Sequence, residues 1–287
     1  MAISIKPSLL LMKKILYISL LACVLACKDS DKSNPSKGDE AVGKGGSSVT
    51  TTVTEPKSIS YSVINTYPHD TSSFTEGLLF YKGDLYESTG IPGKSRIMKL
   101  DLKTGKALKS IDLPKPFFGE GIVILRDTVY QLTYQDKVGF MYTLPDFKKI
   151  KEFTFASPEG WGMTTDGKEI IASDGTSNLS YYQPGTFRLL RTQSVTESGS
   201  LSYNVNELEY IDGYIYANQW QAPYILKIDP SSGAIVGKID FSTICNQIKA
   251  KYPTTDFFNG IAYDSTTQKM YVTGKYWPEL YEIQLSK

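Results

Sequence analysis

Glu120 is the residue whose neighbours in the sequence best suit proton transfer. It stands in the segment Phe118-Gly119-Glu120-Gly121, between an aromatic ring and two glycines. Burial of a carboxyl group against aromatic side chains disfavours its charged form and raises its pKa. A carboxyl group whose pKa lies near neutrality can accept a proton and return it at physiological pH. The segment therefore predicts a general acid–base at Glu120.

Glu120 also belongs to a recurring pattern of positions. Five segments of similar sequence each begin at an anchor residue, and successive anchors are 44, 41, 45 and 53 residues apart. A second set of positions follows fourteen residues after each anchor, or sixteen in the last segment. The anchors are Glu76, Glu120, Trp161, Asn206 and Asn259, and the second set is Gly90, Tyr134, Gly175, Trp220 and Lys275. Positions kept only for packing would repeat small or apolar residues, so this mixture of carboxylates, amides, aromatic rings and one cation predicts a ligand site.

Several of these residues also have a purely structural interpretation. Asn206 and Asn259 can hydrogen-bond the ends of strands, and Trp161 and Trp220 can belong to the core. The glycines that directly follow the anchors suit a close approach of backbones. His69 lies outside both sets of positions, which favours a turn residue over a general base.

The five segments themselves are typical of β-hairpins. Each has an apolar strand, a polar turn such as Asp166-Gly167 or Asp212-Gly213, and a returning apolar strand. A second pair of strand-like segments, broken by turns rich in Asp, Pro, Gly or Thr, runs between successive hairpins. Four strands in a repeat of about 40–45 residues indicate a β-propeller blade. We therefore predict an all-β, five-bladed propeller with four antiparallel strands per blade, and not a doubly wound or TIM-barrel fold.

The fifth repeat is one strand short. Residues 58–67, SISYSVINTY, can supply the missing strand, so we expect them to complete the last blade and close the ring. The extra residues before the fifth repeat fall in 241–252, whose apolar positions suit a short helix. We expect one catalytic domain over 58–287 and a monomer.

The first 57 residues differ in composition from the rest. Lysines precede the apolar run ILYISLLACVLA, which is too short to span a bilayer and suits the core of a signal peptide. Cys27 directly follows this run and polar sequence comes after it, a pattern typical of bacterial lipoproteins. The alternatives are acylation of Cys23 and cleavage without lipidation. We expect a signal peptide over 1–26 and a lipid-anchored flexible tether over 27–57. Lys28 after the cysteine favours the outer membrane, on its periplasmic or surface face.

Composition excludes several kinds of function. One histidine and three cysteines cannot build most catalytic zinc sites. The chain has 31 basic and 30 acidic residues without a basic block, so we expect no nucleic-acid partner. Removal of residues 1–26 takes away three lysines and no acid, which makes the mature chain slightly acidic. With Cys27 lipidated, Cys245 has no partner for a disulfide, and we expect it in the core.

Several of these segments resemble a known family. The motifs FTEGLLF, FFGEGIVIL, GWGMTTDG, NELEYIDGYIYANQW and MYVTGKYW have the order and spacing found in plant and bacterial glutaminyl cyclases (glutaminyl-peptide cyclotransferases). That family has a five-bladed propeller and is unrelated to the zinc-dependent animal enzymes. The resemblance runs from about Tyr61 to Leu285. It implies conversion of an N-terminal glutaminyl residue to pyroglutamate with release of ammonia, and peptides or proteins with N-terminal Gln as substrates.

The resemblance also implies roles for the residues that match each motif. The Glu of FGEG is Glu120, the proton-transfer residue, and the Asn of NELEY and the Lys of VTGK, Asn206 and Lys275, are expected beside the substrate amide. Aromatic walls are implied at Phe74, Phe118, Trp161 and Trp220. Two residues depart from the family pattern, because Glu76 stands where a neutral amide is common and Tyr134 where Trp is. The first departure can change the preferred substrate charge or couple Glu76 to Glu120.

The chemistry of cyclisation suits this set of residues. We hypothesise that Glu120 takes a proton from the attacking α-amine and returns it to the leaving nitrogen, while Lys275 and Asn206 stabilise the oxyanion. No cofactor or catalytic metal is required, and the sequence is compatible with a structural calcium ion in the channel. One alternative is a non-catalytic, lipid-anchored propeller that binds a peptide or glycan at the channel mouth. Another is a calcium-dependent, lactonase-like propeller. Five repeats, with one lysine facing two carboxylates, fit that class poorly.

Overall fold

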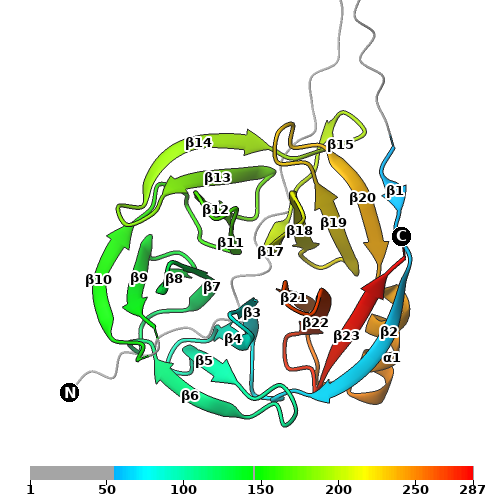
Figure 1. Ribbon diagram of the computed structural model, residues 1–287, viewed down its shortest axis with the longest axis horizontal. Helices are drawn as coiled ribbons and strands as arrows, with labels where there is room; N and C mark the ends of the chain where they lie inside the picture. Colours follow the sequence, from blue (N-terminus) through cyan, green and yellow to red (C-terminus); the bar gives the residue numbers. More distant parts are fainter. Residues whose placement is uncertain (1–54, 145, 287) are drawn as a thin grey trace, which may run out of the picture. The chain divides into compact units, whose positions relative to one another are not determined.

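A computed structural model of the protein describes residues 55–144 and 146–286. In this part of the chain, five antiparallel sheets lie around a common centre as the blades of a propeller (Figure 1). The all-β, five-bladed fold predicted from the repeats is confirmed. The predicted signal peptide over 1–26 and Cys27 lie outside the described residues, as does nearly all of the predicted tether.

The first four blades follow one another along the chain, each built from its innermost to its outermost strand. Blade one comprises β3 (Thr75–Tyr81), β4 (Asp84–Thr89), β5 (Arg96–Leu100) and β6 (Ala107–Asp112), and blade two comprises β7 (Gly119–Leu125), β8 (Thr128–Thr133), β9 (Val138–Thr143) and β10 (Lys149–Thr154). Blade three comprises β11 (Met163–Thr165), β12 (Ile170–Ser173), β13 (Asn178–Gln183) and β14 (Arg188–Ser194). Blade four comprises β17 (Val205–Ile211), β18 (Tyr214–Gln219), β19 (Tyr224–Ile228) and β20 (Ile235–Asp240). A small hairpin of β15 (Thr196–Glu197) and β16 (Ser200–Leu201) connects the third and fourth blades. Every residue of the inner strand β7 is buried, whereas most of the outer strand β14 is exposed, so the core lies between the inner strands of the blades.

The fifth blade is assembled from both ends of the domain. The C-terminal segment supplies β21 (Phe258–Asp264), β22 (Lys269–Gly274) and β23 (Glu279–Leu285). The outer strand is β2 (Tyr61–Pro68), which pairs antiparallel with β23 from one end to the other. This pairing closes the ring, as predicted, and leaves no unpaired edge between the first and last blades. The short β1 (Lys57–Ser58) adds to blade four beside β20.

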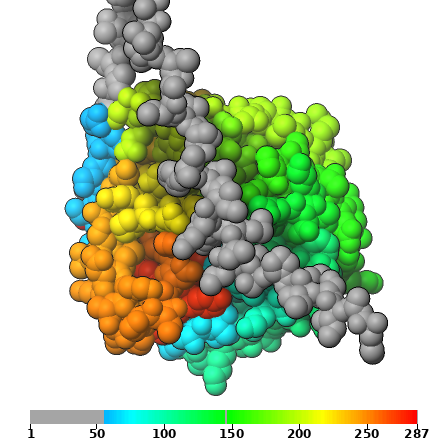
Figure 2. Space-filling view, turned by 180° about the vertical axis from the view of Figure 1, so that it is seen from behind, coloured from blue at the N-terminus to red at the C-terminus, as the bar shows by residue number. Residues whose placement is uncertain are grey.

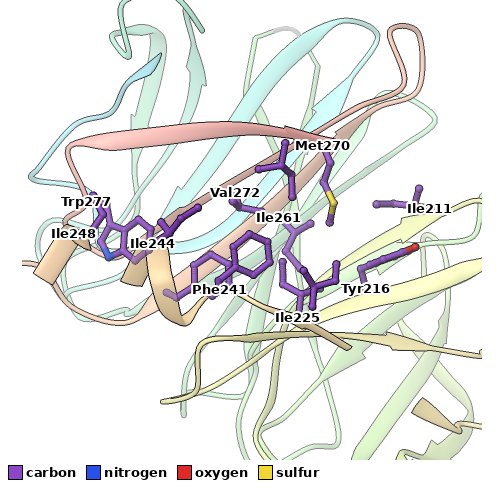
Figure 3. Close-up of a cluster of buried hydrophobic side chains, with 13 residues drawn as sticks. Ile211, Tyr216, Ile225, Phe241, Ile244, Ile248, Ile261, Met270, Val272 and Trp277 are labelled. Carbon is purple, nitrogen blue, oxygen red and sulfur yellow. The ribbon is translucent and has the colours of Figure 1, made fainter. Parts of the chain in front are cut away.

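The predicted short helix is present as α1 (Ser242–Lys251), between β20 and β21. Its buried residues Ile244 and Ile248 face Trp277 and Phe241 in an apolar cluster under blades four and five (Figure 3). In the part of the chain that the structure describes, no helix is long and apolar enough to cross a membrane.

Polar side chains in the second strands hold neighbouring blades together near the axis. The hydroxyl of Ser88 donates to the backbone carbonyl of Glu120, and that of Ser173 donates to the carbonyl of Asn206. The Asn218 side chain likewise accepts a backbone N–H of β21 at 2.8 Å. Each of these side chains stands twelve residues after an anchor and binds the inner strand of the next blade. The repeat that forms the blades therefore also fixes the anchors relative to one another.

His69 makes hydrogen bonds to blades five and one and so links these two blades. Its Nδ1 lies 2.7 Å from the carbonyl oxygen of Trp277, and its Nε2 lies 3.1 Å from a carboxylate oxygen of Glu87. Both side chains of the histidine–glutamate pair are buried. Burial by itself lowers the pKa of His69, but the charge and hydrogen bond of Glu87 and the Trp277 carbonyl raise this pKa above its ordinary value. As its sequence position indicated, His69 takes no part in the cavity described below.

We expect His69→Gln to lower the free energy of unfolding by about 3 kcal/mol at pH 6, because it leaves a buried carboxylate without its cation. The folded-state pKa is raised, so this contribution is fully present below about pH 6.5, the pKa of an unfolded histidine. It is lost as the pH rises through the folded-state pKa. Urea unfolding at pH 6 and pH 9 measures the effect. A difference from wild type that stays equal at both values would contradict a charged His69.

Candidate active site

A cavity of about 590 Å³ opens at the end of the channel where the inner strands begin. Its lining includes every residue to which the sequence analysis assigns a catalytic or substrate-binding role, namely Phe74, Glu76, Phe118, Glu120, Tyr134, Trp161, Asn206, Trp220 and Lys275. The structure thus brings together residues from all five blades, although their catalytic roles stay predictions. Cys27, the predicted lipidation site, lies outside the described residues.

β-Bulges in the inner strands place the anchors at this cavity. The pairing of β3 with β4 skips Glu76, and the pairing of β7 with β8 skips Glu120 and the glycine after it. The pairing of β17 with β18 is interrupted in the same way at Asn206. A bulge breaks the regular alternation of a strand and re-aims the side chain at that point. The anchor side chains therefore leave the ladder at the level of the cavity.

Glu76 and Lys275 form a buried ion pair in the cavity wall. The Lys275 Nζ lies 2.7 Å from Oε1 of Glu76, and the two side chains are only 6% and 3% exposed. The same ammonium lies 4.4 Å from the centre of the Phe74 ring, which adds a cation–π contact. Burial raises the pKa of Glu76 to about 7, against the lowering effect of Lys275.

Asn259 supports this pair from outside the cavity. Its Nδ2 donates to the backbone carbonyl of Thr75 at 3.0 Å and to Oε2 of Glu76 at 3.3 Å. Although Asn259 is an anchor, it does not line the cavity. Its contacts match the structural interpretation, in which an asparagine binds the end of a strand.

Glu120 is the carboxyl group best placed to hold a proton. It is 5% exposed. Burial raises its pKa well above the ordinary value, the charges of Glu76 and Glu159 raise it further, and Lys275 lowers it. Lys275 is the only lysine or arginine among the described residues that line the cavity, and Glu76 already pairs with it. The lining therefore holds four carboxyl groups, those of Glu76, Glu120, Glu159 and Asp174, and one ammonium group, which is paired with Glu76. This leaves Glu120 able to gain or lose a proton.

Aromatic rings enclose this charged centre on two sides. One row runs over blades one and two, where Phe74 packs edge-on against Phe118 at 5.8 Å between ring centres and Phe118 contacts Tyr134 at 5.8 Å. The other runs over blades three and four, where Trp161 and Trp220 meet at 5.5 Å and an angle of 75°. The lining of the cavity thus combines these aromatic rings with the polar groups of Glu76, Glu120, Asn206 and Lys275.

Two glycines of the second set make room for these rings. A Cβ on Gly90 would lie 2.2 Å from the ring of Phe118, and a Cβ on Gly175 would lie 2.5 Å from the ring of Trp161. Any larger residue at either position would displace an aromatic wall. Gly90 itself does not line the cavity, whereas Gly175 does.

The sequence prediction missed five lining residues: Pro158, Glu159, Asp174, Thr176 and Asn204. Glu159 accepts a hydrogen bond from Nε1 of Trp161 at 2.9 Å and another from Gln135 at 2.8 Å, so it fixes the tilt of the indole. A signal for two of the five was present. The position two before an anchor holds Phe74, Phe118, Glu159, Asn204 and Phe257 in the five repeats, and the first four of these residues line the cavity.

Fold and site together define a class of protein. Two buried carboxyl groups, one lysine and an amide lie among aromatic rings at the end of the propeller channel. Such a set of groups suits an enzyme that moves protons on a small polar group of its substrate. Among the described residues, no group of three or more His, Cys, Asp or Glu side chains is arranged to hold a metal ion.

The chain belongs to the glutamine cyclotransferase family, whose sequence model matches residues 40–285. It is 40% identical over 227 residues to the glutaminyl-peptide cyclotransferase of Arabidopsis thaliana, a match that covers 78% of this chain and 71% of the plant protein. Among solved structures, the Myxococcus xanthus glutaminyl cyclase matches with a TM-score of 0.76 and 32% identity, over 81% of this chain and 99% of that one. The family indicated by the sequence motifs is confirmed.

Proposed function

We propose that this protein is a glutaminyl-peptide cyclotransferase, which converts N-terminal glutaminyl residues of peptides and proteins to pyroglutamate and ammonia. Membership of the family and the activities named for the two relatives support this proposal. The observation that carries it is the buried Glu120 carboxyl, which shares one cavity with Lys275 and Asn206. A proton carrier and oxyanion donors are what this cyclisation needs.

In the proposed reaction the α-amino nitrogen attacks the γ-carbonyl carbon, and the new carbon–nitrogen bond closes a five-membered ring. The bond from that carbon to the amide nitrogen then breaks, and ammonia leaves. Glu120 takes the proton from the attacking nitrogen and delivers it to the leaving nitrogen, so no net proton is consumed. Lys275 and Asn206 donate hydrogen bonds to the oxyanion formed between the two steps. Trp161 and Trp220 hold the glutamine side chain folded back on its own amine, which supplies orientation.

The raised pKa of Glu120 suits this role. A peptide α-amine has a pKa of about 7.7–8.0, whereas an ordinary glutamate has one of about 4.3. Transfer from the ammonium to an ordinary carboxylate would therefore cost about 5 kcal/mol. Burial and the charge of Glu76 raise the pKa of Glu120 and reduce that cost.

We propose a mechanism without a metal, since the base and the oxyanion donors are all side chains. His69, the only histidine, is bound to Glu87 and Trp277 and does not line the cavity. Turnover in a strong chelator tests this mechanism, and thermal unfolding in the same chelator tests for a structural calcium ion in the channel. Loss of turnover without loss of fold would contradict the metal-free mechanism.

The activity itself is tested with the purified mature chain and a peptide that begins with Gln. Mass spectrometry follows the loss of one ammonia against the spontaneous reaction. The same peptide with an acetylated N-terminus is the control, because its nitrogen cannot attack, and it should not react. No acceleration on the free peptide would overturn the enzymatic proposal and favour a propeller that only binds peptides.

We further propose that the protein is exported and anchored to the outer membrane by lipid on Cys27, with residues 27–57 as a tether. The apolar run and the lysine after the cysteine support this proposal. We expect Cys27→Ser to move the protein from the membrane fraction to the soluble fraction and to abolish incorporation of labelled fatty acid. Cys23→Ser is the matched control and should leave both unchanged. The reverse pattern would assign the lipid to Cys23.

A further inference from the structure

A second cavity, of about 420 Å³, lies between blades four and five, and we name it the α1 groove. It is bounded by α1, by residues 221–223 after β18 and by residues 255–258, which lead into β21. Figure 2 shows the yellow chain near residue 220 beside the orange chain that contains α1. Trp277, 2% exposed, forms its base and packs against the buried isoleucines of α1 (Figure 3).

The lining of the α1 groove is mainly apolar. Phe257, Phe258 and Trp277 contribute aromatic surface. Cys245, expected in the core, is only partly buried because α1 lies at the surface, and its side chain lines the groove. Burial raises the pKa of this thiol to about 12, so the group stays protonated and uncharged at physiological pH. Lys249, the one basic residue among the described residues that line the groove, donates to two backbone carbonyls of the 252–257 segment.

The α1 groove shares a wall with the candidate active site. Trp220 lines the active-site cavity and contacts Phe257, which lines the groove, at 6.1 Å between ring centres. The backbone N–H of Lys275 donates to the carbonyl of Phe257, and the N–H of Asp256 donates to the carbonyl of Lys275, both at 2.9 Å. One layer of chain therefore separates the two cavities, and it includes the backbone of the active-site lysine.

The residues at this wall have strained backbones. Gln221, directly after Trp220, has φ 63°, and Tyr276, directly after Lys275, has φ 61°. The left-handed region costs a residue with a Cβ about 1–2 kcal/mol. Such conformations persist where the surroundings fix them, and they cluster at ligand sites. Here they hold the ring of Trp220 and the side chain of Lys275 at the edge between the two cavities.

The proposed reaction needs an exit for the rest of the substrate. Only the N-terminal residue takes part in ring closure, and its carbonyl carbon stays bonded to the next residue. Phe257, 38% exposed, lines the α1 groove beside Trp220, and a departing chain would cover it. Two extended residues span about 7 Å. The second or third residue of a peptide whose first residue lies beside Trp220 therefore reaches Phe257, whose ring centre is 6.1 Å from that of Trp220. A peptide that crosses this wall enters the α1 groove with its second or third residue.

We propose that the α1 groove binds the peptide that follows the N-terminal glutamine and accepts an apolar side chain from its second or third residue. The inference rests on the proposed function, since it extends the same active site. It makes the enzyme selective for substrates with an apolar residue close to the N-terminus.

The test compares two peptides of equal length, Gln-Gly-Gly-Gly-amide and Gln-Leu-Phe-Gly-amide. We expect wild-type kcat/KM to be at least tenfold higher for the second, through a lower KM. Asn246→Trp places a large ring in the groove from an exposed position on α1 and should remove this preference. Gln247→Trp is the matched control, because Gln247 is also exposed on α1 but does not line the groove, and it should keep the preference.

Turnover of the glycine peptide should equal the wild-type value in Gln247→Trp. In Asn246→Trp the ratio of kcat/KM for the two peptides is the readout, and urea unfolding at the wild-type midpoint shows that the variant is folded. Equal kcat/KM for the two peptides in the wild type would overturn the inference alone. A preference that survives in Asn246→Trp would overturn it as well, since the groove would then be filled without effect. Absence of turnover on both peptides in the wild type would instead overturn the proposed function, and the inference with it.

Discussion

Glu120→Gln is expected to lower kcat at least about a hundredfold on a peptide with N-terminal Gln, because it removes the group that carries the proton between the two nitrogens. The amide has nearly the shape of the carboxyl group and keeps the cavity filled, so KM should change by only a few-fold. Stopped assays over hours, with the spontaneous rate subtracted, measure the residual turnover. The remaining activity then measures the contribution of orientation and oxyanion stabilisation in the absence of proton transfer.

Glu159→Gln is the matched control for this variant. Glu159 lines the same cavity, but its carboxylate oxygens already accept hydrogen bonds from Trp161 and Gln135. A glutamine keeps one acceptor for the indole, so we expect a loss of under about tenfold. Near-normal kcat in Glu120→Gln would move the catalytic assignment elsewhere, with Glu76 as the next candidate.

The blades could be predicted from sequence because their pairing is mostly local. Each repeat places four strands in consecutive residues, and short turns pair each strand with its neighbour. Closure by β2 followed from the same count, since the fifth repeat lacks a strand; residues 58–67 were predicted to supply it, and Tyr61–Pro68 does so. The helix α1 followed from the position of the extra residues in the longest interval.

The cavity could be predicted less completely, because a ring position does not determine where its side chain points. Glu76 and Asn259 occupy equivalent positions in their repeats. Glu76 lines the cavity, whereas Asn259 lies outside the lining and donates a hydrogen bond to the Glu76 carboxylate. Gly90 is absent from the lining because the ring of Phe118 covers its place. Glu159 gains its position through hydrogen bonds to side chains of two different blades, which no local pattern predicts.

Glu76 stands where the sequence resemblance leads us to expect a neutral amide, and Glu76→Gln tests the effect of its charge on the pH dependence of activity. The Glu76 charge raises the pKa of Glu120, so its removal should lower that pKa. Activity rises with pH as Glu120 loses its proton in the free enzyme. The acid limb of the kcat/KM profile should therefore move to lower pH, while the maximal kcat stays within about tenfold. The two carboxyl groups titrate as a pair, so the limb reports an apparent pKa of that pair.

Lys275→Met is expected to reduce kcat about a hundred- to a thousandfold, the usual effect of losing one oxyanion donor. It should also destabilise the fold, because Glu76 loses the ammonium 2.7 Å away and stays buried. Glu76 then takes a proton, and its pKa rises further above that of an unfolded glutamate, about 4.3. Since the folded state then binds more protons, the variant should lose stability as the pH rises above that value.

The double variant Glu76→Gln/Lys275→Met separates the two effects of the lysine. It contains no unpaired charge at this position, so we expect unfolding in urea at pH 8 to return close to the wild-type midpoint. Turnover should stay as low as in Lys275→Met, because the donor to the oxyanion is still missing. If turnover instead recovers along with stability, Lys275 acts only as the partner of Glu76, and oxyanion stabilisation must be assigned to Asn206. Equal loss of stability in the single and double variants would show that the lysine stem, rather than its charge, supports the cavity wall.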